Sequence, residues 1–179
     1  YEAIDPVRFI GNHSSGKMGI AIAKELYRRG GEVTLIMGPT ATGFSANGIH
    51  LVRVSTAGDM YKACHKIFAN TDLAVMSAAV ADYTPENVAD KKIKKSNADN
   101  LSLQLKPTKD ILKSLGDKKT KSQVLVGFAL ETNDEIANAK IKLHNKNLDF
   151  IVCNTLKDNG AGFGTDTNKI SIIEKSGKM

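Results

Sequence analysis

The feature that most constrains the fold of this chain is the alternation of short apolar runs with helical patterns along most of its length. Residues 73–80 (LAVMSAAV) and 124–130 (VLVGFAL) are almost continuously apolar, as is typical of parallel strands that are covered on both faces. Segments such as residues 18–29 have apolar positions three or four residues apart, which indicates helices with one buried face. This alternation predicts an α/β fold with a doubly wound, mostly parallel sheet and helices on both faces.

The individual elements follow from the same patterns. Gly30 and Gly31 end the first helix, whose predicted buried face includes Ala21, and Thr56 and Asn133 can cap two later helices. Besides residues 18–29, helices are predicted at 57–69, 110–115 and 135–145, and further strands at 32–37, 51–54, 148–153 and 169–174. Ligands of doubly wound sheets bind beyond the carboxyl ends of the strands. The candidate binding loops therefore follow Met37, Val80, Leu130 and Cys153.

Length and composition are those of an ordinary globular domain. The 179 residues contain no internal repeat or low-complexity linker, so we expect a single domain over residues 1–179. The sequence has no apolar run of membrane-spanning length and no secretory signal, which predicts a cytoplasmic protein that does not contact the membrane. Cys64 and Cys153 lack metal-ligand spacing and are expected to be buried free thiols. The chain opens at Tyr1 without a methionine, so we expect a fragment.

The formal net charge of +6 favours an anionic ligand. Nucleic acid would also suit this charge, but only 6% of the residues are aromatic and they do not alternate with basic residues. A base-stacking platform for single strands is therefore poorly supported. We expect small anionic ligands and no nucleic acid.

The segment Gly11 to Gly19 (GNHSSGKMG) lies directly before a predicted helix. Small residues let a ligand approach the backbone, and a helix amino terminus offers free N–H groups and a partial positive charge. The string also matches the start of a P-loop, GxxxxGK, but Met18 stands where that motif needs a magnesium-binding Ser or Thr. A glycine-rich turn that merely starts the helix is the alternative. The candidate phosphate- or substrate-binding residues are Ser14, Ser15, Gly16 and Lys17.

Three further segments carry candidate ligand-binding residues. In residues 78–83 (AAVADY), small alanines leave space for a flat ring, and Asp82 could bind a ribose hydroxyl or magnesium, or could simply start a turn. The lysine-rich residues 91–95 (KKIKK) could close over a polyphosphate, or could be only a solvated surface. In residues 127–133 (GFALETN), Phe128 could stack on a base or belong to the core.

Five strings occur in a fixed order: DPVRFIGNHSSGKMG, AAVADY, KKIKK, GFALETN and KNLDFIVCN. Together they resemble phosphopantothenoylcysteine synthetase, also called phosphopantothenate–cysteine ligase, which is the synthetase domain of the bacterial bifunctional coenzyme A biosynthesis protein. The likeness covers almost the whole chain and implies a three-layer α/β/α sandwich with a Rossmann-like sheet. It also implies a reaction in which CTP activates 4′-phosphopantothenate as an acyl-cytidylate with release of pyrophosphate. The amine of L-cysteine then displaces CMP.

The resemblance implies roles for individual residues. Asn12 falls on the asparagine that positions the acyl intermediate, Arg8 on a position associated with the same half-reaction, and Lys92 on the flap lysine used to form the acyl nucleotide. Mg²⁺ would assist, with Asp82 as its candidate protein ligand, and the enzyme would be a homodimer with sites near the subunit interface. The implied nucleotide pocket contains Met76, Ser77, Ala78, Asp82, Lys92, Lys109, Asp110, Ile111, Leu112, Phe128, Lys142 and Lys146.

Three parts of the family pattern lie outside this sequence. A glycine-rich first strand would precede Tyr1, a helix would follow Met179, and a flavin-dependent decarboxylase domain often stands before this one. We therefore expect a domain whose first strand and last helix have been trimmed, with no flavin of its own. The alternative function is an NAD(P)-binding, Rossmann-type oxidoreductase module. It would need a GxGxxG turn and an acidic residue about 20 positions later, and the sequence has neither in the right frame.

Overall fold

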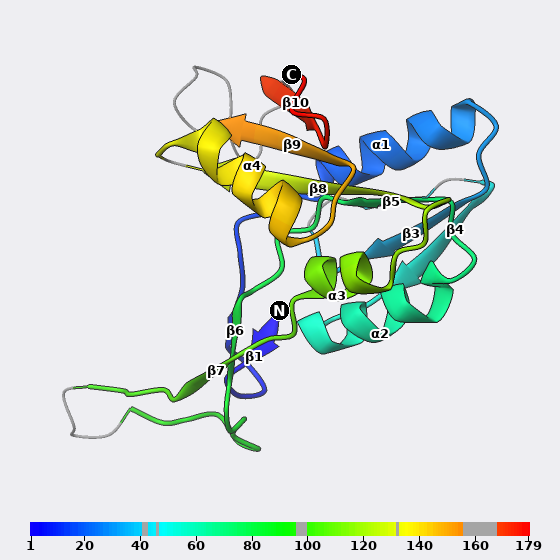
Figure 1. Cartoon of the computed structure of the whole chain (residues 1–179). Helices are drawn as coiled ribbons and strands as arrows, with labels where there is room; N and C mark the ends of the chain where they lie inside the picture. The colour runs from blue at the N-terminus through cyan, green and yellow to red at the C-terminus, as the bar shows by residue number, and fades with distance from the viewer. Residues whose placement is uncertain (41–42, 46, 96–99, 132, 156–167) are drawn as a thin grey trace.

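The centre of the computed structural model is a four-stranded sheet in the order β10-β9-β8-β5 (Figure 1). The structure describes residues 1–40, 43–45, 47–95, 100–131, 133–155 and 168–179. Strands β5 (Leu73–Met76), β8 (Val124–Glu131) and β9 (Phe150–Thr155) pair in parallel, and β10 (Ile170–Glu174) adds to β9 in the antiparallel direction. A separate parallel pair is formed by β3 (Val33–Met37) and β4 (Ile49–Arg53).

The helices belong to two core clusters, which lie on opposite faces of β3. The main core cluster joins β8 and β9 to α2 (Ala57–Phe68), α3 (Ile111–Lys118) and α4 (Glu135–Asn145), whereas α1 (Lys17–Arg28) packs with β3 and β4 in a second cluster. On β3, Val33, Leu35 and Met37 belong to the cluster of α1, and Ile36 packs against that of α2. Because alternate residues of a strand face opposite sides, α1 and α2 lie on opposite faces of β3. The predicted α/β fold with parallel strands is confirmed.

The capping residue predicted from the sequence is right for α2 and wrong for α4. At α2 the prediction is confirmed, because Thr56 Oγ1 accepts a hydrogen bond from the Asp59 amide (3.0 Å) and the Thr56 amide donates to Asp59 Oδ2 (3.2 Å). The buried Glu2 carboxylate adds a further acceptor for the Ala57 amide at 2.7 Å. At α4 the prediction is wrong, because the N-cap is Asp134 in the left-handed conformation and not Asn133.

Other expectations need correction. The strand predicted over residues 73–80 ends at Met76, and none of its four residues is fully buried, with Leu73 40% exposed. Ala21 is exposed on α1, where Ile20 and Ala23 are the buried residues. Two short antiparallel pairs were not predicted: β1 (Glu2–Ala3) with β2 (Phe9–Ile10), and β6 (Tyr83–Pro85) with β7 (Leu105–Pro107). The β6–β7 pair begins an arm that extends away from the sheet (Figure 1).

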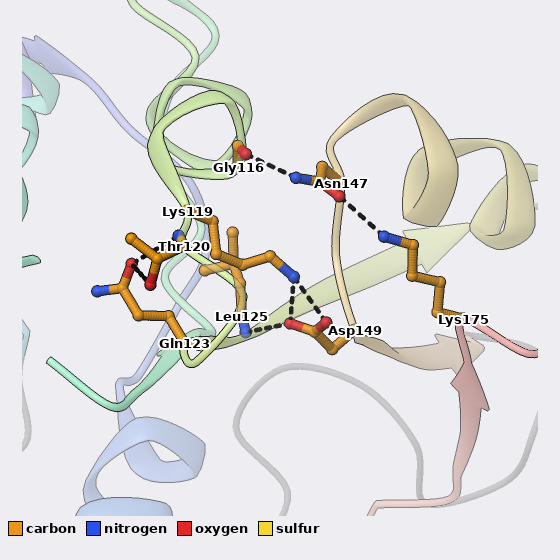
Figure 2. Close-up of polar contacts among 8 residues, drawn as sticks. All are labelled: Gly116, Lys119, Thr120, Gln123, Leu125, Asn147, Asp149 and Lys175. Carbon is orange, nitrogen blue, oxygen red and sulfur yellow. Dashed lines mark hydrogen bonds and ion pairs between the residues drawn. The ribbon is translucent and has the colours of Figure 1, made fainter.

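A polar network joins the amino ends of β8 and β9 (Figure 2). Lys119 Nζ donates to both carboxylate oxygens of Asp149 at 2.6 Å, and the Leu125 amide donates to the same carboxylate at 2.7 Å. Asn147 extends the network by donating to the Gly116 carbonyl and accepting from Lys175 Nζ, each at 2.9 Å. The network therefore ties α3, both strands and the segment after β10 together.

Both cysteine side chains are buried free thiols, as predicted. Burial raises the pKa of the Cys64 thiol to about 11, so only about one molecule in a thousand carries this thiolate at pH 8. We expect Ellman's reagent to react slowly with the folded protein and to reach two thiols per chain only after unfolding in urea. Rapid reaction of the folded protein would contradict the burial of Cys64 and Cys153.

Candidate functional site

The loop before α1 delivers an open helix amino terminus to the carboxyl end of the sheet. The N-cap Gly16 adopts a left-handed conformation (φ 75°), and a Cβ atom there would lie 2.9 Å from Thr40 Cγ2, so the turn requires glycine. The N-cap residue, Gly16, has no side chain that could cap this helix, the Lys17 amide donates to Ser15 Oγ over a long 3.4 Å, and the first turn has no acidic residue. The helix start therefore keeps N–H groups and a partial positive charge suited to an anion.

The same loop meets the segment that follows β5. Asn12 Nδ2 donates to the carbonyl oxygens of Ala79 (3.2 Å) and Val80 (3.1 Å). In the first turn of α1, a Cβ atom on Gly19 would lie 3.1 Å from Ser77 Oγ, so helix and strand end approach closely. Asn12, Ser14 and Ala78 are exposed, and Ser77 is half-buried. The structure thus brings two of the predicted segments together through Asn12.

The loop after β5 is also held to the residues that precede α3. Thr108 donates its amide to the Asp82 carbonyl (2.9 Å) and its hydroxyl to the Ala81 carbonyl (2.7 Å). The next residue, Lys109, places its ammonium 4.8 Å from the centroid of the Tyr61 ring on α2. The Asp82 side chain is exposed. Thr108 was missed by sequence reasoning, because no local pattern distinguishes a hydroxyl that bonds a distant loop.

The start of α3 faces α4 through charged side chains. Asp110 caps α3 by accepting from the Lys113 amide (2.9 Å), and it forms an ion pair with Lys146 Nζ (2.9 Å). Burial alone would raise the pKa of Asp110, but the Lys146 ammonium and the Lys113 amide outweigh burial and lower it. Ile111 is buried, so any ligand contact that it makes comes from its backbone.

The carboxyl half of β8 lies against the same two helices. Lys142 Nζ on α4 donates to the Phe128 carbonyl at 2.9 Å, and the Phe128 side chain is half-buried. A Cβ atom on Gly127 would lie 2.9 Å from Leu112 Cδ2, so α3 packs directly on this strand. Because Met76 pairs with Gly127, these residues are next to the end of β5. The structure therefore gathers the predicted nucleotide-binding residues of α3, α4 and β8 beside the Asn12 loop.

The lysine-rich segment, residues 91–95, is placed by contacts from the amino-terminal residues. Lys92 is exposed, and Ile93 is half-buried. The Arg8 guanidinium is held by its neighbours. Its Nε donates to Asp5 (3.0 Å), and its Nη2 donates to both Asp5 (2.5 Å) and the Ile93 carbonyl (2.8 Å). Asp5 was missed by sequence reasoning, although the pair Asp5-Pro6 is a turn signal that could have drawn attention to it.

The described part of the chain contains neither a metal-binding cluster nor a membrane-spanning helix. No group of three or more His, Cys, Asp or Glu residues there is placed to hold a metal ion. No helix there has the length and apolar character needed to cross a bilayer.

The chain is similar to known proteins over nearly its whole length. The chain is 52% identical over 178 residues to a protein from an unidentified prokaryote named cysteine/cysteine sulfinic acid decarboxylase, covering 99% of this chain and 49% of that one. It is 48% identical over 176 residues to the coenzyme A biosynthesis bifunctional protein CoaBC of Bacillus subtilis, covering 98% and 43%. The chain thus spans about half the length of the curated relatives it matches.

Solved structures and a family comparison complete the assignment. The crystal structure of the C-terminal domain of CoaBC superposes with a TM-score of 0.80 at 40% identity, covering 99% of this chain and 78% of that chain. Residues 1–179 match the family described as the DNA/pantothenate metabolism flavoprotein C-terminal domain. This chain therefore belongs to the DNA/pantothenate metabolism flavoprotein C-terminal domain family.

Proposed function

We propose that residues 1–179 form a single phosphopantothenate–cysteine ligase domain of coenzyme A biosynthesis. The observation that carries the proposal is the junction at Asn12, where the loop before an open helix amino terminus is hydrogen-bonded to the loop after β5. The relatives named CoaBC, which are 38–48% identical in the comparisons, support the same function. The NAD(P)-binding alternative has no support from these relatives.

The first half-reaction brings two anions together. A carboxylate oxygen of 4′-phosphopantothenate attacks the α-phosphorus of CTP, the bond to the bridging oxygen breaks, and pyrophosphate leaves with the electron pair. The start of α1 supplies groups that offset the repulsion between the two anionic reactants. They are backbone N–H groups, hydroxyls and an ammonium, and they come from Ser14, Ser15, Gly16 and Lys17. Lys92, on the exposed segment, is the cation that we assign to the developing charge on the phosphates.

The nucleotide would lie along the carboxyl ends of β5 and β8. Lys142 and Lys146 now contact the Phe128 carbonyl and Asp110, and both can exchange these partners for phosphate oxygens. The half-buried ring of Phe128 can contribute apolar surface to the base. The other proposed nucleotide contacts are Met76, Ser77, Ala78, Asp82, Lys109, Ile111 and Leu112.

In the second half-reaction the amine nitrogen of L-cysteine attacks the acyl carbon. A tetrahedral oxyanion forms, the bond from carbon to the CMP phosphate oxygen breaks, and the nitrogen loses a proton to give the amide. Asn12 is our candidate donor to that oxyanion, because an amide donates without titrating. Its Nδ2 now donates to two carbonyl oxygens, so Asn12 must exchange one of these partners to stabilise the intermediate.

Magnesium would enter with the triphosphate. Mg²⁺ commonly keeps several waters and binds one or two carboxylates together with substrate phosphates, so it does not need a cage of protein ligands. The exposed Asp82 carboxylate beside the Asn12 loop fits this mode, and the described residues offer no cluster of three metal-binding side chains. Its chemistry would be to neutralise phosphate charge, while the protein groups position the two substrates.

A homodimer and a decarboxylase partner form the rest of the proposal. Exposed apolar side chains gather on the arm that contains β6 and β7 and on the segments that flank them, namely Tyr83, Val88, Leu101, Leu103 and Leu105. Such a surface favours a protein partner, and a second copy would bury it. The CoaBC relatives are bifunctional and about twice as long, which supports fusion to or pairing with a decarboxylase, and we propose that the protein works in the cytoplasm. Light scattering of the purified chain tests the dimer.

The test of the ligase is substrate-dependent pyrophosphate release. Purified protein is expected to release pyrophosphate from CTP only when 4′-phosphopantothenate is present, and to form the cysteine amide, detected by mass spectrometry, once L-cysteine is added. Parallel reactions with ATP show the nucleotide preference. Equal release without 4′-phosphopantothenate, or calorimetric binding of NADPH in preference to CTP, would contradict the proposal. Release of CO₂ from cysteine would instead support the activity named for the 52% identical relative.

A further inference from the structure

The carboxylate of Asp5 is buried beside the candidate site and accepts many hydrogen bonds. The residue is 2% exposed, and its carboxylate accepts five hydrogen bonds. Oδ1 accepts from the amides of Val7 and Arg8, each at 2.9 Å, and Oδ2 accepts from Nε and Nη2 of Arg8. The fifth donor is the amide of Ile93, 88 positions away in the sequence, at 3.1 Å.

Two further hydrogen bonds join the same two segments. Arg8 Nη2 donates to the Ile93 carbonyl at 2.8 Å, so the guanidinium and the carboxylate together hold both backbone groups of Ile93. The Ala89 amide donates to the Ile4 carbonyl at 3.0 Å. The base of the lysine-rich segment is therefore fixed to residues 4–8, while Lys92, one position before Ile93, is exposed.

We propose that Asp5 is a positioning residue of the ligase, which holds Ile93 and Arg8 so that Lys92 stands at a defined place relative to Asn12. The inference rests on the proposed function. Asn12 is four residues beyond Arg8, so the junction of Asp5, Arg8 and Ile93 joins the residue assigned to the first half-reaction with the residue assigned to the second. Asp5 does not touch the reactants in this proposal and acts only through its neighbours.

The physical reason for such a clamp is the flexibility of lysine. A lysine on a free loop loses much conformational freedom when it contacts a phosphate, whereas a fixed backbone beside it removes part of that loss in advance. Hydrogen bonding from Arg8 holds the pKa of Asp5 far below its ordinary value, so the carboxylate stays charged throughout the neutral range. The clamp is therefore permanently formed at working pH.

Hydrogen exchange tests the clamp without any substrate. In Asp5→Asn one acceptor oxygen becomes an NH₂ group that faces N–H donors. We therefore expect the amides of Ala89 and Ile93 to exchange roughly tenfold faster, as measured in a peptide spanning residues 86–95. Glu25→Gln is the matched control, because the Glu25 carboxylate also accepts hydrogen bonds from arginine side chains, those of Arg28 and Arg29, but on an exposed face of α1. Unchanged exchange in Asp5→Asn would overturn the proposal.

A double-mutant cycle tests the link to Lys92. Asp5→Asn is expected to lower the rate of pyrophosphate release roughly 10- to 100-fold in the wild-type background, with little change in the KM for CTP. In a Lys92→Ala background the same change should have almost no further effect, because the group that Asp5 positions is gone. Equal fold losses in both backgrounds would show a merely structural role and would overturn the proposal.

Two precautions keep the outcomes separate. If Asp5→Asn does not fold, Arg8→Lys replaces it, since lysine keeps the charge but loses the forked contact with Asp5 and Ile93. A wild-type protein that releases no pyrophosphate would contradict the ligase assignment itself and this inference with it. A failed clamp in an active ligase contradicts the inference alone.

Discussion

Replacing Asn12 with alanine is expected to slow amide formation by roughly 100- to 1000-fold, while the first turnover of pyrophosphate release continues. The reason is that the acyl-cytidylate forms with help from cationic groups, whereas its attack by cysteine needs a donor at the new oxyanion. Asn12 is exposed beside the open start of α1 and has a side-chain amide for this purpose. Rapid-quench measurements of pyrophosphate and of the cysteine amide in one turnover separate the two steps.

The control for this change is Asn138→Ala. Asn138 is also exposed, and its Nδ2 likewise donates to a backbone carbonyl, that of Asn133, at 3.0 Å. Loss of that bond should leave both half-reactions unchanged. If Asn12→Ala slows pyrophosphate release and amide formation equally, the contacts with Ala79 and Val80 matter for both steps. Asn12 would then be a loop anchor, and its assignment to the oxyanion would be wrong.

Replacing Asp149 with alanine is expected to lower the free energy of unfolding by about 3 kcal/mol. The side chain of Lys119 is only 7% exposed and that of Asp149 27%, so the change leaves a nearly buried ammonium without its carboxylate (Figure 2). The Leu125 amide loses its acceptor at the same time. Urea denaturation followed by circular dichroism measures the loss, and pyrophosphate release below the transition should keep its wild-type rate.

An exposed ion pair on α3, the helix that ends just before Lys119, provides the matched comparison. Lys113 and Asp117 are four residues apart on α3 with Nζ and Oδ1 3.0 Å apart, and both side chains are more than half exposed. Asp117→Ala should therefore cost less than about 0.5 kcal/mol. Equal losses for Asp117→Ala and Asp149→Ala would show that burial does not set the strength of the Asp149 contact. Replacing Lys119 and Asp149 together with apolar residues should cost less than Asp149→Ala alone.

The helices of this fold could be predicted because their signals are local. Apolar periodicity located α1, α2 and α4 to within one residue at each end, and Thr56 was identified as a cap from its own neighbourhood. The cap of α4 could not be chosen in this way. Asn133 and Asp134 are both good capping residues, and the left-handed backbone that decides between them is set by the surrounding structure.

The strands and the site depended more on distant partners. Small apolar residues continue past Met76, so composition could not show that the carbonyls of Ala79 and Val80 bond to Asn12 instead of to a neighbouring strand. Strands of two or three residues, such as β1 and β7, have too few positions for an alternating pattern. Arg8 was identified through a resemblance, but its partners, Asp5 and Ile93, are visible only in the fold.

The network around Asp149 lies at the amino ends of β8 and β9, whereas Asn12 and Phe128 lie toward the carboxyl ends of the strands. Substitutions at the two edges of the sheet share none of the contacts described above, so their effects should combine additively. Substitutions at the amino-terminal edge of the sheet can therefore change the melting temperature without lowering the turnover rate set at the carboxyl-terminal edge. Homologues from hot and cold habitats should differ in sequence mainly at the amino-terminal edge, around Lys119.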